Sequence, residues 1–170
     1  MVELKIANTM KQKILLLLII VFWNHLSQAQ VVEWAELFGG NFNDGVNDLD
    51  TDASGNIYAT GLFFDEVRLD PNSTAGNFTT AGNFDIYLAK YNSAGEYQWG
   101  FSIGGADNDR SYGILVDGAS IYIVGEFSGT MDFDPGAGIN SKTSAGGFDA
   151  FIAKYNSSGG LIWVNTFGWI

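Results

Sequence analysis

The pentapeptide Ala-Lys-Tyr-Asn-Ser occupies Ala89–Ser93 and returns unchanged 64 residues later as Ala153–Ser157. The repetition extends around it, because residues 57–104 and 121–168 are identical at 19 of 48 aligned positions. The shared positions include tyrosine, glycine, aspartate and tryptophan, among them Gly61 and Gly125. A fixed period of this length indicates a modular protein in which each unit buries an apolar face against the next.

Each unit contains four apolar stretches separated by turn signals. In the first unit the stretches are Val46–Asp52, Ile57–Phe63, Asp85–Tyr91 and Tyr97–Ile103, and in the second they are Ser111–Asp117, Ile121–Phe127, Asp149–Tyr155 and Leu161–Phe167. They are rich in β-branched and aromatic residues, and Asn-Ser-x-Gly at 92–95 and 156–159 is typical of hairpins. The sequence therefore predicts two four-stranded antiparallel meanders, residues 46–104 and 111–168, and no helix outside the N-terminal leader.

The predicted strands are apolar on both faces. Ile121 and Ile123 point to one side of their strand, and Tyr122 and Val124 point to the other. A sheet with one wet face would alternate apolar with polar residues, so this pattern predicts sheets covered on both sides. Four-stranded sheets stacked face to face around an axis are propeller blades, and the predicted fold is an all-β, partial β-propeller of two blades.

The second unit contains four linked motifs, and Trp163 follows them. The motifs are Tyr112–Asp117, Ile121–Gly125, Phe127–Gly136 and Asp149–Tyr155. Their combination makes the pattern specific. Together they resemble the seven-bladed beta-propeller repeat (SBBP) family, and the resemblance covers nearly all of residues 32–168. It implies a propeller in an exported or cell-surface bacterial protein. It implies no catalytic or binding residues, because the family has none in common.

Residues 1–29 are predicted to be a signal peptide, with the true start at Met10. Met10–Lys13 is basic, Ile14–Trp23 is apolar, and Ser27–Ala29 fits a cleavage site. The apolar run is shorter than the roughly 20 residues that a membrane span needs. We therefore expect a bacterial protein that is secreted or displayed on the cell surface, that starts at Gln30 and that does not span the membrane.

Composition excludes several kinds of chemistry. The only histidine, His25, lies in the leader and the chain has no cysteine, so His- or Cys-based nucleophilic catalysis, the usual zinc sites and disulfides are excluded. The leader also contains three of the eight basic residues and one of the nineteen acids, so residues 30–170 have a net charge of −13. Such a surface repels nucleic acid and anionic membranes. No cofactor is expected.

The chain is short for a closed propeller, which typically has four to eight blades. Val32–Phe38 matches Tyr97–Ile103 and so is predicted to be an orphan fourth strand. The earlier copies of the fourth strand end in Gly39-Gly40 and Gly104-Gly105, whereas the third copy reads Gly168-Trp169-Ile170. These features suggest a truncated or frameshifted product. We expect the outer sheet faces to be uncovered and the chain to need missing blades or self-association.

Two acidic segments are candidate calcium sites. The alternating acids of Asp48–Asp52 resemble the start of a calcium loop, but Ala53 replaces the required glycine, and Gly113 and Leu115 replace the first two acids in the next unit. Asp52 recurs as Asp117, which favours a turn. Whether either acidic segment binds calcium stays open.

The second segment, Asp132–Gly136, shares only its Asp-Pro pair with Asp70–Pro71, which also favours a turn.

Carboxylate pairs and tryptophans offer the remaining candidates. Asp85 and Asp149 recur at strand starts, whereas a catalytic pair would be unique. Trp34, Trp99 and Trp163 recur at one position, which favours core packing over sugar stacking. The leading hypothesis is a non-catalytic protein that presents loops for protein or glycan binding. The alternatives are a lectin whose two-blade subunits assemble into one ring, and a carboxylate-based glycoside hydrolase.

Overall fold

The structure is a computed structural model that describes residue 35 and residues 39–168. The predicted leader, the predicted strand Val32–Phe38 apart from Ala35, and the C-terminal residues 169–170 lie outside the described residues.

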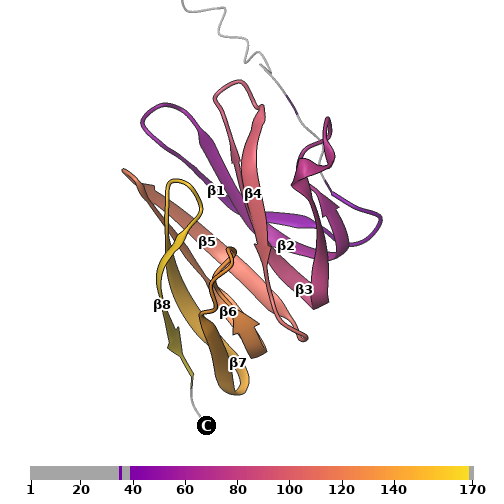
Figure 1. Ribbon diagram of the computed structural model, residues 1–170, viewed down its shortest axis with the longest axis vertical. Helices are drawn as coiled ribbons and strands as arrows, with labels where there is room; N and C mark the ends of the chain where they lie inside the picture. The colour runs from indigo at the N-terminus through magenta and orange to yellow at the C-terminus, as the bar shows by residue number, and fades with distance from the viewer. Residues whose placement is uncertain (1–34, 36–38, 169–170) are drawn as a thin grey trace, which may run out of the picture. The chain divides into compact units, whose positions relative to one another are not determined.

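Within the described residues, eight strands form two four-stranded antiparallel sheets, and strands that follow one another in sequence are neighbours in each sheet (Figure 1). The first sheet consists of β1 (Gly45–Thr51), β2 (Ile57–Arg68), β3 (Asn77–Tyr91) and β4 (Tyr97–Ile103). The second consists of β5 (Asp109–Asp117), β6 (Ser120–Asp132), β7 (Ser141–Asn156) and β8 (Leu161–Phe167). The all-β class, the eight strands and the meander order are therefore confirmed.

The hairpins form where the turn chemistry predicts them. Asn92 Oδ1 accepts hydrogen bonds from the backbone N–H groups of Ala94 and Glu96, and Asn156 Oδ1 accepts the equivalent bonds from Ser158 and Gly160. The glycines at 95 and 159 both have φ of 84°, in the region that other residues rarely adopt. The Asn-Ser-x-Gly segments are therefore hairpin turns.

The central strands are longer than the sequence predicts. β2 and β3 continue as a paired ribbon from Glu66 and Thr79 to Arg68 and Asn77, and β6 and β7 continue in the same way. A bulge separates each extension from the rest of its sheet, at Asp65 (φ 69°) and Gly129 (φ 67°). The bulge interrupts the period-2 pattern on which the prediction depended. One 3₁₀ turn, η1 (Thr74–Gly76), was also not predicted.

The two sheets pack through unlike faces. We call face A the side that carries Phe63 and Ala89 in the first sheet and Phe127 and Ala153 in the second. Face B is the opposite side of each sheet. Face B of the first sheet packs on face A of the second, and their shared core includes Tyr58, Leu88, Phe101, Ile123, Phe151 and Tyr155.

The two outer faces differ. Face A of the first sheet is buried in a second cluster that includes Phe63, Val67 and Leu69, and Tyr91 O–H donates to the Leu69 carbonyl at 2.9 Å. The expectation that it would be uncovered is wrong over β2 and β3, because the loop after β2 folds back over them, but on β1 of the same face Val46 and Leu49 are 47% and 58% exposed. Face B of the second sheet is open, since Val124 is 40% and Leu115 57% exposed. For this face the expectation is confirmed.

Candidate functional site

The junction between the sheets forms where β5 lies beside β1 and β2 (Figure 1). Asp48, on face B of β1, bridges the two edge strands. Its Oδ2 accepts the Ile114 N–H of β5 at 2.9 Å, and its Oδ1 accepts the N–H of its neighbour Leu49 at 2.9 Å. One carboxylate therefore satisfies an edge amide from each sheet.

Asp50 repeats this arrangement two residues further along. Its Oδ2 accepts the Val116 N–H at 2.7 Å and its Oδ1 accepts the Thr51 N–H at 2.8 Å. Charged acceptors form the stronger class of hydrogen bond. The two aspartates thus form a ladder that ties β5 to β1.

In the segment Asp48–Asp52, the first two acids have a structural role in the ladder that was not predicted from the sequence. Asp52 takes no part in it, because its Oδ1 accepts the N–H groups of Ser54 and Asn56 in a turn, as predicted. The side-chain hydrogen bond from Asn56 is the main reason why the pKa of Asp52 is lowered. Among residues 35 and 39–168, no group of three or more acidic or histidine side chains is placed to hold a metal ion.

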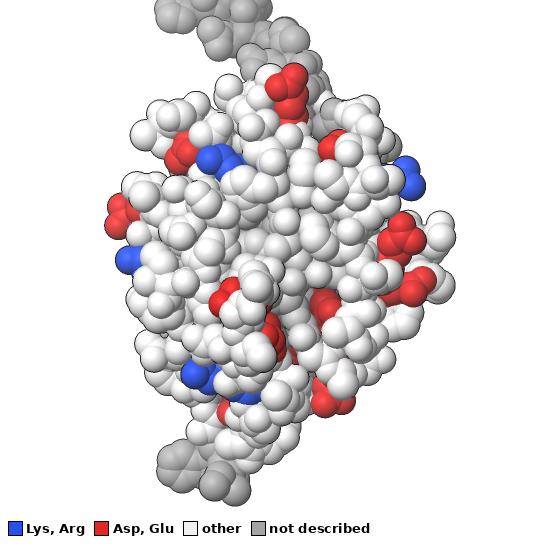
Figure 2. Space-filling model, in the orientation of Figure 1, with Lys and Arg blue, Asp and Glu red and all other residues white. Residues whose placement is uncertain are grey.

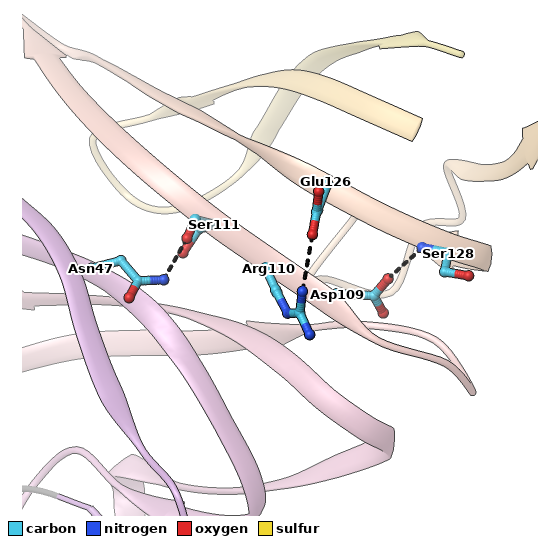
Figure 3. A network of polar contacts seen from close by, with 6 residues as sticks. All are labelled: Asn47, Asp109, Arg110, Ser111, Glu126 and Ser128. Atoms are coloured by element: carbon cyan, nitrogen blue, oxygen red, sulfur yellow. Dashed lines mark hydrogen bonds and ion pairs between the residues drawn. The ribbon is translucent and has the colours of Figure 1, made fainter. Parts of the chain in front are cut away.

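A buried polar contact lies beside the ladder at Ser111, whose hydrogen bond with Asn47 is drawn in Figure 3. Thr60 Oγ1, on face B of β2, donates to Ser111 Oγ at 2.9 Å, and Ser111 Oγ donates to the Gly61 carbonyl at 3.1 Å. Asn47 Nδ2 donates to the Ser111 carbonyl at 2.6 Å. Thr60 and Ser111 are fully buried. Neither residue was predicted from the sequence, because an isolated Ser or Thr carries no repeat signal.

Two buried carboxylates occupy the end of the junction. Asp109 accepts the Gly105 N–H at 2.6 Å and the Ser128 N–H at 3.2 Å (Figure 3). Asp85 accepts the Ala81 N–H at 2.7 Å through Oδ2, while its buried Oδ1 has no hydrogen-bond partner within the described part of the chain. Burial raises the pKa of Asp85 to about 6, and the charge of Asp109 adds to the rise. Burial also raises the pKa of Asp109.

Asp109 has a counterpart that the sequence could have indicated. Gly40 N–H donates to Asp44, and Gly105 N–H donates to Asp109 in the same way. A Gly-x-x-x-Asp segment therefore leads into the first strand of each sheet. Asp85 likewise corresponds to Asp149, which accepts the Ala145 N–H at 2.9 Å. The recurring acids therefore hold backbone amides within each sheet.

The remaining acidic candidates lie in turns. Asp134 Oδ1 accepts the Gly136 N–H at 2.8 Å, as Asp70 Oδ1 accepts the Asn72 N–H at 2.9 Å, and Asp132 Oδ1 accepts the N–H groups of Asp134 and Asn140. These contacts confirm the turn interpretation.

The tryptophans divide between the core and the open face. Trp99 packs against the core between the sheets, where it stacks on Phe101 with an interplanar angle of 2°. Trp163 lies on the open face B beside Tyr122, and Trp34 lies outside the described residues.

The open face B of the second sheet repeats the geometry of the buried face B of the first. Tyr122 and Trp163 meet edge to face at 6.3 Å, as Tyr58 and Trp99 do at 6.2 Å. In both sheets a lysine ammonium lies 5.0 Å from the centre of the tyrosine ring. The open face is thus already arranged like a surface that binds a sheet.

One end of the open face is hollowed. The hollow measures about 610 Å³ and is lined by Tyr112, Gly125, Glu126, Phe148, Ala150, Phe167 and Gly168. Arg110 lies 5.3 Å from the centre of the Phe148 ring and pairs with Glu126 at 3.2 Å (Figure 3). Aromatic side chains with a few oriented polar groups are typical of binding surfaces. We take open face B and the junction as the candidate interaction site.

The charged side chains do not form a basic patch on the face of the described residues shown in Figure 2. Acidic groups are spread over it, with isolated basic groups between them. Within residues 35 and 39–168, no helical segment has the length and apolarity that a bilayer crossing requires.

Neither a model of a known protein family nor a curated protein sequence matches this chain.

Removal of both ladder carboxylates should weaken the junction. In the double variant Asp48→Ala with Asp50→Ala, four backbone amides lose charged acceptors, and we expect a loss of roughly 2–4 kcal/mol of unfolding free energy because water replaces the acceptors only in part. Urea denaturation measures the loss. The variant Glu66→Ala, which removes an exposed acid from β2, is the control. A double variant as stable as the control would show that the ladder contributes nothing.

Proposed function

We propose that this chain is a non-catalytic, exported β-propeller repeat protein or a fragment of one. In this proposal the two sheets are consecutive blades, and their loops are presented for protein or glycan binding at the bacterial cell surface. The observation that carries the proposal is the packing of face B of one sheet on face A of the next.

Packing through unlike faces can be repeated. A pair of sheets that share one inner face, as in a sandwich, leaves two outer faces that need no further partner. Here each sheet has apolar residues on both faces, so each can bind one neighbour through face A and another through face B. A head-to-tail contact of this kind generates a ring when its rotation closes.

The position of the first strands also supports blades. β1 and β5 are the edge strands nearest to each other, and the aspartate ladder joins them. In a propeller the first strand of each blade lies nearest the axis, where the blades approach most closely.

The use of the acids supports a non-catalytic role. Asp85 and Asp149 each bind a backbone amide of their own sheet, and each does so at the same place in the repeat. Besides open face B, the exposed hairpin turns are surfaces at which a partner can make contact. Their length and sequence can vary without disturbing the sheets.

Export and binding can be tested together. Bacteria that produce the full chain should release it or display it, with its leader removed, and the released protein should bind surface glycans or proteins on an array. Exchange of the hairpin turns, one at a time, should remove that binding while the circular dichroism spectrum is unchanged. Retention in the cytoplasm, or hydrolysis of glycosides that is lost in Asp85→Asn, would contradict the proposal.

A further inference from the structure

We propose that the open face B of the second sheet binds the first sheet of a second copy of this chain, with β1 as the main contacting strand. The inference rests on the proposed function, because it uses the same packing of face B on face A. Three differences between the two units identify β1 as the strand that fits.

The first difference is the replacement of a polar pair by an apolar one. At the internal junction Thr60 of face B meets Ser111 of face A. In the second sheet Val124 takes the place of Thr60, because each stands four positions into the matching part of its strand, at Ile57–Thr60 and Ile121–Val124. A sheet that binds here therefore meets an apolar side chain where Ser111 meets Thr60, which favours an apolar residue in the place of Ser111.

β1 carries such a residue. Val46 pairs with Gly61 as Ser111 pairs with Gly125, so Val46 is the counterpart of Ser111. Val46 is 47% exposed and Val124 is 40% exposed. Contact between the two valines would bury apolar surface on both sides, whereas a hydroxyl in the place of Ser111 would lose the partner that Thr60 provides and keep only a carbonyl acceptor of the kind that Gly61 provides.

The second difference concerns the ladder. The second sheet has Gly113 and Leu115 where the first has Asp48 and Asp50, as the strand registers show. Neither residue has a side-chain acceptor. The edge N–H groups of β5 depend on the carboxylates of β1. If a first strand with the same need docked on the open face, its edge N–H groups would have no partners there.

The third difference is that β1 satisfies its own edge amides. The N–H groups of Leu49 and Thr51 already donate to the Oδ1 atoms of Asp48 and Asp50. Leu49 is itself 58% exposed, and Leu115 of the open face is 57% exposed. β1 therefore offers the open face an apolar side and no unmet amide.

The extent of the contact follows from the internal junction. There β5 is the strand of the second sheet that approaches β1, β2 and β3. Phe63 and Ala89 on face A of the first sheet are already buried, so β2 and β3 of the second copy are not free to make the contact. β1 of the second copy therefore makes it, against β5, β6 and β7 of the first copy. The chain has a formal net charge of −11, so added salt should strengthen the association by screening repulsion between copies.

Two variants of the full chain test each side of the contact separately. Val124→Lys alters the open face and Val46→Glu alters β1, and each alone should abolish the concentration-dependent association seen by sedimentation velocity. An equimolar mixture of the two should associate again, because one copy of each keeps a native half of the contact and the other halves have opposite charges. Ile139→Lys, at a loop residue that is 83% exposed, is the matched control and should associate like the natural chain.

Other results would overturn the proposal. Association that survives Val46→Glu but not Val124→Lys would indicate a contact between two open faces, and association that survives both would indicate another part of the chain. A natural chain that stays monomeric up to high concentration and salt would also overturn it. Circular dichroism of each variant excludes unfolding as the cause. The proposed propeller depends on the internal junction and would stand in each of these cases.

Discussion

Replacement of Gly125 by alanine is expected to destabilise the chain by about 3 kcal/mol or more, the upper end of the usual cost of overpacking. A Cβ at this position would lie 2.0 Å from the Arg110 carbonyl oxygen and 2.8 Å from the Phe151 ring. The first of these atoms belongs to the backbone of the neighbouring strand, which cannot move without breaking the pairing of β5 with β6. Urea denaturation should show a lower midpoint with an unchanged slope.

The matched control for this prediction is Gly147→Ala in β7. A Cβ at Gly147 would meet nothing within 4 Å. We expect the control to be neutral or slightly stabilising, because alanine restricts the unfolded chain more than glycine does. Equal losses in the two variants would show that β-sheet glycines matter here for a reason other than close approach.

Replacement of Asp85 by asparagine is expected to stabilise the chain at pH 7 by roughly 1–3 kcal/mol, the upper value being the free energy that corresponds to a pKa raised from 3.8 to about 6 without screening by solvent. Between these two values the folded chain binds more protons at Asp85 than the unfolded chain does. The natural protein should therefore be most stable, as far as this group is concerned, below pH 3.8, and should lose stability as the pH rises to about 6. Asparagine can accept the Ala81 N–H and has no charge to bury.

The measurement is the difference in unfolding free energy between Asp85→Asn and the natural chain at several pH values. The difference should be largest near pH 7 and should disappear toward pH 4. Asp52→Asn provides a control of opposite sign, because hydrogen bonding lowers the pKa of Asp52 and its neutralisation should cost stability at neutral pH. If Asp85→Asn were less stable than the natural chain at pH 7, the charged carboxylate would be the favoured form.

The sequence was sufficient to predict the strands and their order. The repeated hairpin segments at 92–95 and 156–159 and the β-branched and aromatic stretches between them depend on local chemistry, and local chemistry is repeated. The extensions of β2 and β6 were missed because a bulge at Asp65 or Gly129 shifts the alternation by one residue. A search for alternating apolar residues does not detect a strand that continues after a bulge, because the alternation there is shifted by one residue.

The junction was harder to predict than the strands. Asp48 and Asp50 were considered only as part of a possible calcium loop, because their partners across the junction are backbone amides 66 residues away. A backbone amide leaves no trace in the sequence. The burial of Asp85 near Asp109 could not be predicted from the sequence either. The two acids belong to different repeats, and the charge of one acts on the other only because the sheets stack.

The carboxylate ladder has one more consequence, for the solubility of the chain. Exposed strand edges are templates on which other chains add strands, and this is how cross-β aggregates begin. The N–H groups of Leu49, Thr51, Ile114 and Val116 would be such a template, but Asp48 and Asp50 occupy all four. An incoming strand would have to displace four charge-assisted hydrogen bonds and approach two negative charges. The residues that join the sheets therefore also protect the chain from amyloid-like growth along β1 and β5.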